Sequence, residues 1–177
     1  MTTPHSEKDP LAGAKRTLRE RVLDRRNALC DADRAAASRV LAERFMARAE
    51  FSRARTVMAY ASIESEVQTA HIIERTLHEG KRLVLPRVNR VRRQLDLFLI
   101  ANLDLDLQPG TWGILEPNPE RCEFIEGTNY IELVLVPGVA FTMRGERLGY
   151  GGGFYDRLLG AGRAQVVSWQ PLLMSKS

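Results

Sequence analysis

The segment VPGVAFTMRGERLGYGGGFYDRLL, residues 136–159, constrains the fold of this chain more than any other. The apolar run Ile131–Val136 predicts a buried strand, and four glycines within positions 149–153 precede a short helix predicted at Phe154–Gly160. Glycines permit positive φ angles and a close backbone approach, and the N–H groups that open a helix bind anions. A strand, a glycine-rich turn and a helix in this order favour an α/β fold with a ligand at the carboxyl ends of its strands.

The glycine-rich turn alone leaves two interpretations open, a tight connection or a phosphate cradle. It matches neither GxxxxGK[ST] nor GxGxxG. Arg147 immediately before the turn favours phosphate, because a guanidinium beside exposed amides suits phosphate geometry. Asp156 follows in the first turn of the helix, where it can stabilise the helix dipole or serve as a Mg²⁺ ligand.

The rest of the chain alternates between helical and strand patterns. We predict helices over residues 11–29, 32–49 and 69–79, and strands over 56–61, 82–85, 94–100 and 164–169. Asp31 is the expected cap of the second helix, whose Val40, Leu41 and Phe45 should face inward. Pro86 should end the strand predicted at 82–85. Residues 102–127, rich in Pro, Gly, Asn and Asp, should be mostly loop. We expect a three-layer α/β/α sandwich with a mostly parallel, Rossmann-like sheet.

Composition indicates one globular domain. The 177 residues are 44% apolar, and no stretch is long and apolar enough for a membrane span or a signal peptide. We therefore expect a disordered N-terminus at 1–10, a single domain at 11–177 and a cytoplasmic monomer. Cys30 and Cys122 are isolated and should be packing thiols. His71, Glu74 and His78 share a helical spacing that could meet a metal, although a solvated helix face is the commoner meaning of that spacing.

Basic residues are segregated within the formal net charge of +4. On the first helix an apolar stripe should face inward, with Lys15, Arg19 and Arg26 along one flank. The stripe comprises Leu11, Ala14, Leu18, Val22 and Leu29. A second basic segment spans residues 81–93. Aromatic residues do not interleave either segment, so an anionic small molecule is favoured over nucleic acid.

Four stretches together resemble the 5-formyltetrahydrofolate cyclo-ligase family. The most specific is RLGYGGGFYDRLL, preceded by VPGVAF; the others are the run from Lys15 to Arg19, Glu66 with Thr69 in SIESEVQTAHII, and WGILEP from Trp112 to Pro117. The resemblance extends from about residue 14 to residue 160. It implies phosphoryl transfer from ATP to the formyl oxygen of 5-formyltetrahydrofolate, followed by ring closure to 5,10-methenyltetrahydrofolate.

The resemblance also implies roles for individual residues, with Mg²⁺ as cofactor and ATP as co-substrate. Lys15 and Arg147 would be catalytic, and Asp156 would hold Mg²⁺. The substrate would be bound by Arg19, Ala61, Glu66, Tyr150, Gly151, Gly152, Gly153 and Phe154. ATP would be bound by Lys15, Arg16, Thr17, Leu18 and Arg19, and by Arg147, Leu148, Gly149, Tyr150, Gly151, Gly152, Gly153, Phe154 and Tyr155. No nucleic acid or membrane is implied as a partner.

Three departures from the family pattern keep other functions in view. Thr142 and Gln68 stand where acidic residues are usual, and the domain is expected to be short at its C-terminus. The alternatives are a noncatalytic folate- or nucleotide-binding relative and a basic RNA-associated protein. Without the resemblance, Glu66 would be interpreted as an exposed loop carboxylate.

Overall fold

The structure, a computed structural model, describes residues 10–110, 113–160 and 165–168. Its helices are α1 (Pro10–Asn27), α2 (Asp31–Met46), α3 (Ala49–Arg53), α4 (Ala70–His78), α5 (Leu103–Asp106) and α6 (Phe154–Gly160). The strands of its main sheet are β1 (Thr56–Met58), β2 (Arg82–Asn89), β3 (Gln94–Ile100), β6 (Glu123–Ile125), β7 (Leu133–Val136) and β10 (Gln165–Ser168). Two small hairpins pair β4 (Leu107–Pro109) with β5 (Leu115–Pro117), and β8 (Ala140–Phe141) with β9 (Arg147–Leu148).

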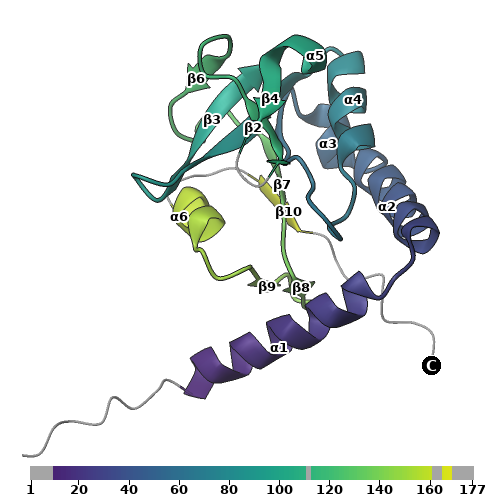
Figure 1. Ribbon diagram of the computed structural model, residues 1–177. Helices are drawn as coiled ribbons and strands as arrows, with labels where there is room; N and C mark the ends of the chain where they lie inside the picture. The colour runs from purple at the N-terminus through teal and green to yellow at the C-terminus, as the bar shows by residue number, and fades with distance from the viewer. Residues whose placement is uncertain (1–9, 111–112, 161–164, 169–177) are drawn as a thin grey trace, which may run out of the picture.

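The main sheet has six described strands in the order β10-β7-β1-β2-β3-β6 (Figure 1). β1 pairs in parallel with both β2 and β7, and β7 pairs in parallel with β10. β3 is antiparallel to β2 and to β6, so the sheet is mixed. The predicted α/β class is confirmed, and the expected strand–helix–strand unit is present as β1, α4 and β2.

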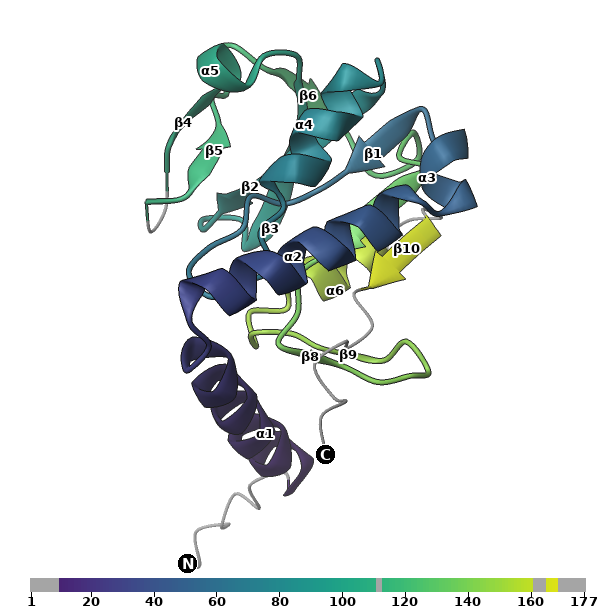
Figure 2. The same ribbon diagram turned by 90° about the vertical axis from the view of Figure 1, so that its right-hand side faces the viewer.

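Alternate residues of the central strands face two separate apolar clusters. Val57, Leu83 and Leu133 face the first cluster, which α2, α3 and α4 cover. Their neighbours Met58, Val84 and Val134 face the second cluster, against which α6 packs. Because successive strand residues point to opposite faces, α6 lies across the sheet from α2 and α4. Figures 1 and 2 show the same arrangement.

Pro86 does not end β2, contrary to the prediction. β2 continues to Asn89 and pairs with β3 throughout, with Pro86 opposite Leu97. β1 accompanies β2 only as far as Val84, so Pro86 lies beyond the end of its other neighbour and its missing N–H breaks no ladder bond there. β1 itself is shorter than predicted. Residues 102–127, predicted to be mostly loop, contain α5, β4, β5 and β6.

The second helix, α2, forms where predicted, but its cap and one residue of its inner face differ from the prediction. Cys30 rather than Asp31 caps α2: its Sγ accepts a hydrogen bond from Asp33 N at 3.4 Å. Cys30 is therefore an exposed cap and not a packing thiol. Leu41 and Phe45 are buried as predicted, whereas Val40 is 42% exposed.

The apolar stripe of the first helix is not buried, contrary to the prediction: its first three residues are exposed, and Val22 and Leu29 are half-buried. Leu11 is 59% exposed and Leu18 is 39% exposed. The reason is that α1 projects from the body of the molecule and does not lie on the sheet (Figures 1 and 2). Trp112 and both ends of the strand predicted at 164–169 lie outside the described residues.

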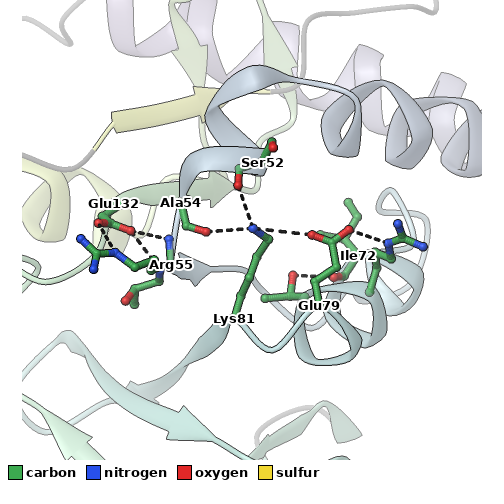
Figure 3. Close-up of polar contacts among 10 residues, drawn as sticks. Ser52, Ala54, Arg55, Ile72, Glu79, Lys81 and Glu132 are labelled. Atoms are coloured by element: carbon green, nitrogen blue, oxygen red, sulfur yellow. Dashed lines mark hydrogen bonds and ion pairs between the residues drawn. The ribbon is translucent and has the colours of Figure 1, made fainter.

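Lys81, at the start of the second basic segment, is engaged within the fold (Figure 3). Its ammonium donates to the carbonyl oxygens of Ser52 at 3.2 Å and Ala54 at 3.0 Å, and pairs with Glu79 at 3.5 Å. It also lies 5.1 Å from the centroid of the Phe51 ring. Lys81 thus joins the end of α4 to α3, and this base is not available to a ligand. No described helix combines the length and the apolar character needed to cross a bilayer.

Candidate active site

Two loops that carry predicted site residues meet because β1 and β7 are parallel neighbours. Their pairing, Met58 with Val134, puts the carboxyl ends of both strands at one edge of the sheet. The loop after β1 contains Ala61 and Glu66, and the segment after β7 contains the glycine-rich turn. This edge is where an open α/β sheet binds its ligand.

The segment after β7 first folds back on itself as the β8–β9 hairpin. Thr142 closes its tip, since its N–H donates to Glu146 O at 2.9 Å and its hydroxyl accepts from Glu146 N at 3.1 Å. Thr142 therefore has a structural role in the hairpin. At the base of the hairpin, a Cβ on Gly138 would lie 2.5 Å from the Phe141 ring and 3.1 Å from Cγ of Arg147. Only glycine leaves both side chains where they are.

The glycine-rich turn itself needs glycine at two positions. Gly151 has φ of +102° and Gly153 has φ of +67°, values that a side chain disfavours. The turn runs directly into α6 at Phe154. Its backbone is exposed at Gly151 and Gly152, so amide groups are accessible to a ligand.

Arg147 is held beside this turn by several contacts. Its Nη1 donates to Pro137 O at 3.1 Å, its Nη2 pairs with Asp156, and its guanidinium lies 5.8 Å from the Tyr155 ring centroid. The Arg147 side chain is 13% exposed, whereas that of Asp156 is 72% exposed. The arginine is thus fixed in position, and its carboxylate partner faces solvent.

The basic flank of α1 faces the turn from the other side. Arg19 Nε donates to Gly149 O at 2.7 Å, which places its guanidinium close to Gly151 as well. Lys15 is exposed one helical turn earlier on the same flank. Arg16, Thr17 and Leu18 are exposed too, and the Thr17 hydroxyl donates back to Gly13 O at 3.3 Å. The structure therefore brings Arg19 to the turn, and Lys15 lies one helical turn away from Arg19.

Arg26 also reaches this site, although sequence reasoning gave it no role beyond its place on the flank. Its Nε donates to Ser65 Oγ at 3.0 Å, and its Nη2 donates to the Tyr150 hydroxyl at 2.7 Å. Ser65, which is 5% exposed, in turn donates to Asn27 Oδ1. The helical register with Lys15 and Arg19 was the one signal that could have indicated this contact.

Glu66 is 5% exposed, so it is not the exposed loop carboxylate that the residues alone suggested. Burial raises the pKa of Glu66, against the opposing effects of a Tyr150 hydrogen bond, the Ile63 N–H and the charge of Arg26. The Ile63 N–H donates to Glu66 Oε2 at 3.1 Å. Glu64, with φ of +45°, makes the turn that directs Glu66 inward.

Two tyrosines keep their protons at this site. Burial and the nearby Glu66 carboxylate raise the pKa of Tyr150. Burial also raises the pKa of Tyr155, which packs against the second apolar cluster. Both hydroxyls therefore stay neutral donors beside an acidic group.

One carboxylate, Asp156, adjoins the turn in the position expected of a metal ligand. Among the described residues no group of three or more His, Cys, Asp or Glu side chains could enclose a metal, and this includes His71, Glu74 and His78. Mg²⁺, however, commonly binds one or two carboxylates together with substrate phosphates. The donor set at Asp156 fits a Mg²⁺ ion brought in with a nucleotide and does not fit a cage built from protein alone.

Gln68 lies apart from these contacts. Its N–H donates to Ser38 Oγ at 3.0 Å, and its side chain lines a groove of about 410 Å³ between α2 and α4 together with Arg39, Glu43 and His71. Gln68 thus lies at the end of the β1 loop, where its contacts are with α2 and α4.

Comparison with known proteins gives one consistent family. The model of the 5-formyltetrahydrofolate cyclo-ligase family matches residues 12–174. The 5-formyltetrahydrofolate cyclo-ligase of Mus musculus is 30% identical over 149 residues, which are 82% of this chain and 73% of the mouse protein. The enzyme of that name from Escherichia coli K12 is 31% identical over 138 residues, 78% of this chain and 75% of the bacterial one.

Other relatives extend the same result. The probable 5-formyltetrahydrofolate cyclo-ligase of Caenorhabditis elegans is 34% identical over 110 residues, and the match spans 60% of this chain and only 53% of the nematode protein. Among solved structures, Aquifex aeolicus 5,10-methenyltetrahydrofolate synthetase superposes with a TM-score of 0.76 at 31% identity, covering 88% of this chain and 77% of that one. The range matched by the family model includes the β1 loop, the glycine-rich turn and α6.

Proposed function

This chain belongs to the 5-formyltetrahydrofolate cyclo-ligase family, and on that premise we propose that it uses ATP to close 5-formyltetrahydrofolate into 5,10-methenyltetrahydrofolate, releasing ADP and phosphate. One observation carries the proposal beyond family membership. The buried carboxylate of Glu66, the glycine-rich turn and the basic flank of α1 converge at one sheet edge, linked by Arg19 to Gly149 and by Arg26 to Tyr150. A pterin-binding acid and a phosphate-binding turn are then adjacent, as transfer between the two ligands requires.

ATP is proposed to bind along α1 and the glycine-rich turn. The exposed amides of the turn, the start of α6, Arg147 and Lys15 supply donors and positive charge for the phosphates. Arg147 is suited to this role because Pro137 and Tyr155 already fix its guanidinium. Arg16 and Lys15 lie on the same side of the helix as Arg19, at i, i+3 and i, i+4 spacing, whereas Thr17 and Leu18 lie on other faces.

Folate is proposed to bind with its pterin against Glu66. The ring N–H and amino groups of a pterin are donors, and a buried carboxylate is a strong acceptor for them. Ala61 lines the same loop, while Arg19 and the segment Tyr150–Phe154 lie between this loop and the ATP side.

The reaction is proposed to run in two displacements. The formyl oxygen attacks the γ-phosphorus, the bond from that phosphorus to the bridging oxygen breaks, and ADP departs. The neighbouring folate nitrogen then attacks the formyl carbon, loses its proton, and phosphate leaves with the former formyl oxygen. Phosphoryl transfer needs positioning and charge neutralisation rather than a covalent nucleophile. Lys15 and Arg147 provide both as cations beside the phosphates.

Mg²⁺ is proposed as the cofactor, with Asp156 as its protein ligand. When bound, the ion would neutralise phosphate charge during transfer. Asp156 would then exchange part of its pairing with Arg147 for the ion, which its exposed position permits.

We also propose that the protein works as a monomer, without nucleic acid or a membrane. The three-layer, Rossmann-like interpretation and the single domain at 11–177 belong to the same proposal, supported by α6 lying across the sheet from α2 and α4.

The decisive experiment mixes the protein with MgATP and 5-formyltetrahydrofolate and follows methenyltetrahydrofolate by its near-ultraviolet absorbance. We expect one ADP for each product molecule, and no ADP when the folate is omitted. Folate-independent ATP hydrolysis, or binding of both ligands with no product, would contradict the cyclo-ligase assignment. The second result would identify a noncatalytic relative.

A further inference from the structure

Resting on the proposed function, we propose that Arg26 is a positioning residue that fixes Tyr150 and Glu66 in the orientation that receives the folate. Its guanidinium contacts a different segment on each side. Nε donates to Ser65 in the β1 loop, and Nη2 donates to Tyr150 in the glycine-rich turn, 124 residues after Arg26 in the sequence. One side chain of α1 thus joins the folate loop to the nucleotide turn.

The direction of these hydrogen bonds determines where the Tyr150 proton points. A guanidinium has donors only, so the Tyr150 oxygen must accept from Arg26. The Tyr150 proton is then left for the nearby Glu66, and the two groups influence each other: Tyr150 lowers the pKa of Glu66, and Glu66 raises the pKa of Tyr150. Glu66 already accepts from the Ile63 N–H at 3.1 Å, so donation from Tyr150 would fix its carboxylate from a second segment of the chain.

The arrangement requires an arginine and not merely a positive charge. Nε and Nη2 lie at fixed directions in one plane, and the central carbon of the guanidinium, Cζ, lies 5.7 Å from the Tyr150 ring centroid. A lysine ammonium supplies the charge from a flexible stem but cannot hold both partners at once in this fork geometry. Arginine and lysine at position 26 should therefore differ in measurable ways.

Several charged or titratable groups face Glu66, and they determine how its charge state responds. Arg26 on α1 lowers the pKa of Glu66, whereas burial, the largest influence, raises it, and Glu64 in the same loop also raises it. Tyr150 in the glycine-rich turn and Tyr155 on α6 are the other groups that interact with this carboxylate. Removal of the positive charge at position 26 should therefore shift the acid limb of the folate-binding pH profile upward.

Arg26→Gln and Arg26→Lys test the proposal together with a matched control, Arg25→Gln. Arg25 is the neighbouring, exposed arginine on α1, so its substitution removes the same charge without touching Ser65 or Tyr150. For Arg26→Gln we expect KM for 5-formyltetrahydrofolate to rise about tenfold or more, the loss typical of a charge-assisted hydrogen bond, with a much smaller change in KM for ATP. Arg26→Lys should restore the acid limb of the pH profile while KM for the folate stays raised.

A double-mutant cycle with Tyr150→Phe identifies the route of the effect. Because the proposal acts through the Tyr150 hydroxyl, Arg26→Gln should cost much less in folate affinity when Tyr150 is already Phe. Equal changes in both KM values, an unshifted pH profile, or additivity in the cycle would overturn the positioning role.

Activity of the parent protein tests the proposed function separately, and calorimetric titration with 5-formyltetrahydrofolate measures the same Arg26 effects without turnover. If the parent makes no product but binds the folate, the cyclo-ligase assignment fails while the Arg26 comparison still decides this inference.

Discussion

At the scale of single residues, Glu66 is placed where folding works against its charge. The side chain is 5% exposed, and burial raises its pKa. Below its ordinary pKa the carboxyl is protonated in both the folded and the unfolded states. Between the ordinary pKa and the raised folded-state pKa, the folded protein binds more protons than the unfolded chain, so stability falls as pH rises through that window. A group that costs stability at neutral pH is typical of a functional site.

Glu66→Gln separates that cost from the proposed use of the charge. The amide keeps an acceptor for the Ile63 N–H but cannot ionise, so we expect the variant to be at least as stable as the parent at pH 8 and to lose this advantage near pH 4. Folate affinity should fall about tenfold or more, with ATP affinity unchanged. Thermal melting at both pH values and calorimetric titration measure these effects. Parent-like folate binding would exclude the pterin-orienting role.

Asp156→Asn distinguishes a metal ligand from a structural partner of Arg147. The Asp156 side chain is 72% exposed, and exposed ion pairs contribute only about 0–1 kcal/mol, so stability should change little. We expect turnover at limiting Mg²⁺ to fall about tenfold or more because one ligand charge is lost, with partial recovery at high Mg²⁺. A Mg²⁺ series of turnover measurements, with melting as the control, gives the result. If turnover stays near normal at low Mg²⁺, phosphate binding depends on the backbone amides and Arg147 instead.

At the scale of elements, the same kind of residue serves different purposes on different helices and strands. Arg19 on α1 contacts the glycine-rich turn, whereas Lys81 joins α3, α4 and β2. Sequence grouped Lys81 with the bases of a possible ligand surface. The structure assigns it to the fold because its side chain is only 10% exposed and three acceptors surround it.

Lys81→Met tests this structural role. Methionine keeps the apolar stem but removes the ammonium from the Ser52 and Ala54 carbonyls, so we expect a loss of about 1.5–3 kcal/mol in the free energy of unfolding. Ligand affinities should not change. Arg82→Met, the adjacent exposed base, is the control and should cost less than about 0.5 kcal/mol. Denaturant titration measures both, and equal losses would contradict the account of Lys81.

Sequence patterns predicted the elements whose residues repeat a clear period. β3 at Gln94–Ile100 and α6 at Phe154–Gly160 have the predicted bounds. The strands β6, β8 and β9 were missed because runs of two or three residues carry no readable alternation. The exposed stripe of α1 was predicted to be buried because periodicity reports a helix and its faces, whereas packing depends on where the chain turns next.

The candidate site was predictable in its parts and not in its connections. The turn at residues 149–153 and the basic flank of α1 were visible in sequence, and the structure brings them together through Arg19 and Gly149. The contact of Arg26 with Tyr150 was not predictable, since it depends on how α1 lies across loops from two distant strands. Burial of Glu66 likewise depends on tertiary packing.

At the scale of the whole molecule, α1 is attached differently from the other long helices. No α1 side chain that the structure describes enters either apolar cluster, while α2 and α4 both contribute buried residues to the first. Polar contacts of Arg19, Arg26 and Asn27 link α1 to the body. Few buried apolar contacts mean a low free energy of local opening.

Amide hydrogen exchange should therefore divide the molecule into two stability classes. We expect α1 amides to exchange through local opening at denaturant concentrations where α2 and α4 remain protected. MgATP should slow exchange in α1 and in residues 149–153, because the proposed ligand bridges them. The amides of α4 serve as the internal reference. Exchange of α1 only through global unfolding, or no response to MgATP, would contradict this description.

The order of the strands has a consequence for biosynthesis. β1 is flanked by β2, which is translated soon after it, and by β7, which emerges from the ribosome only after β2, β3 and β6. Until then the nascent chain presents one open edge of β1, whose three residues are buried in the folded protein, to chaperones and to other chains. Binding of the ligand must wait longer still, because the glycine-rich turn follows β7. A newly made molecule can thus pair five strands of the sheet, β6, β3, β2, β1 and β7, before the glycine-rich turn has emerged, whereas β10 can join only after that turn.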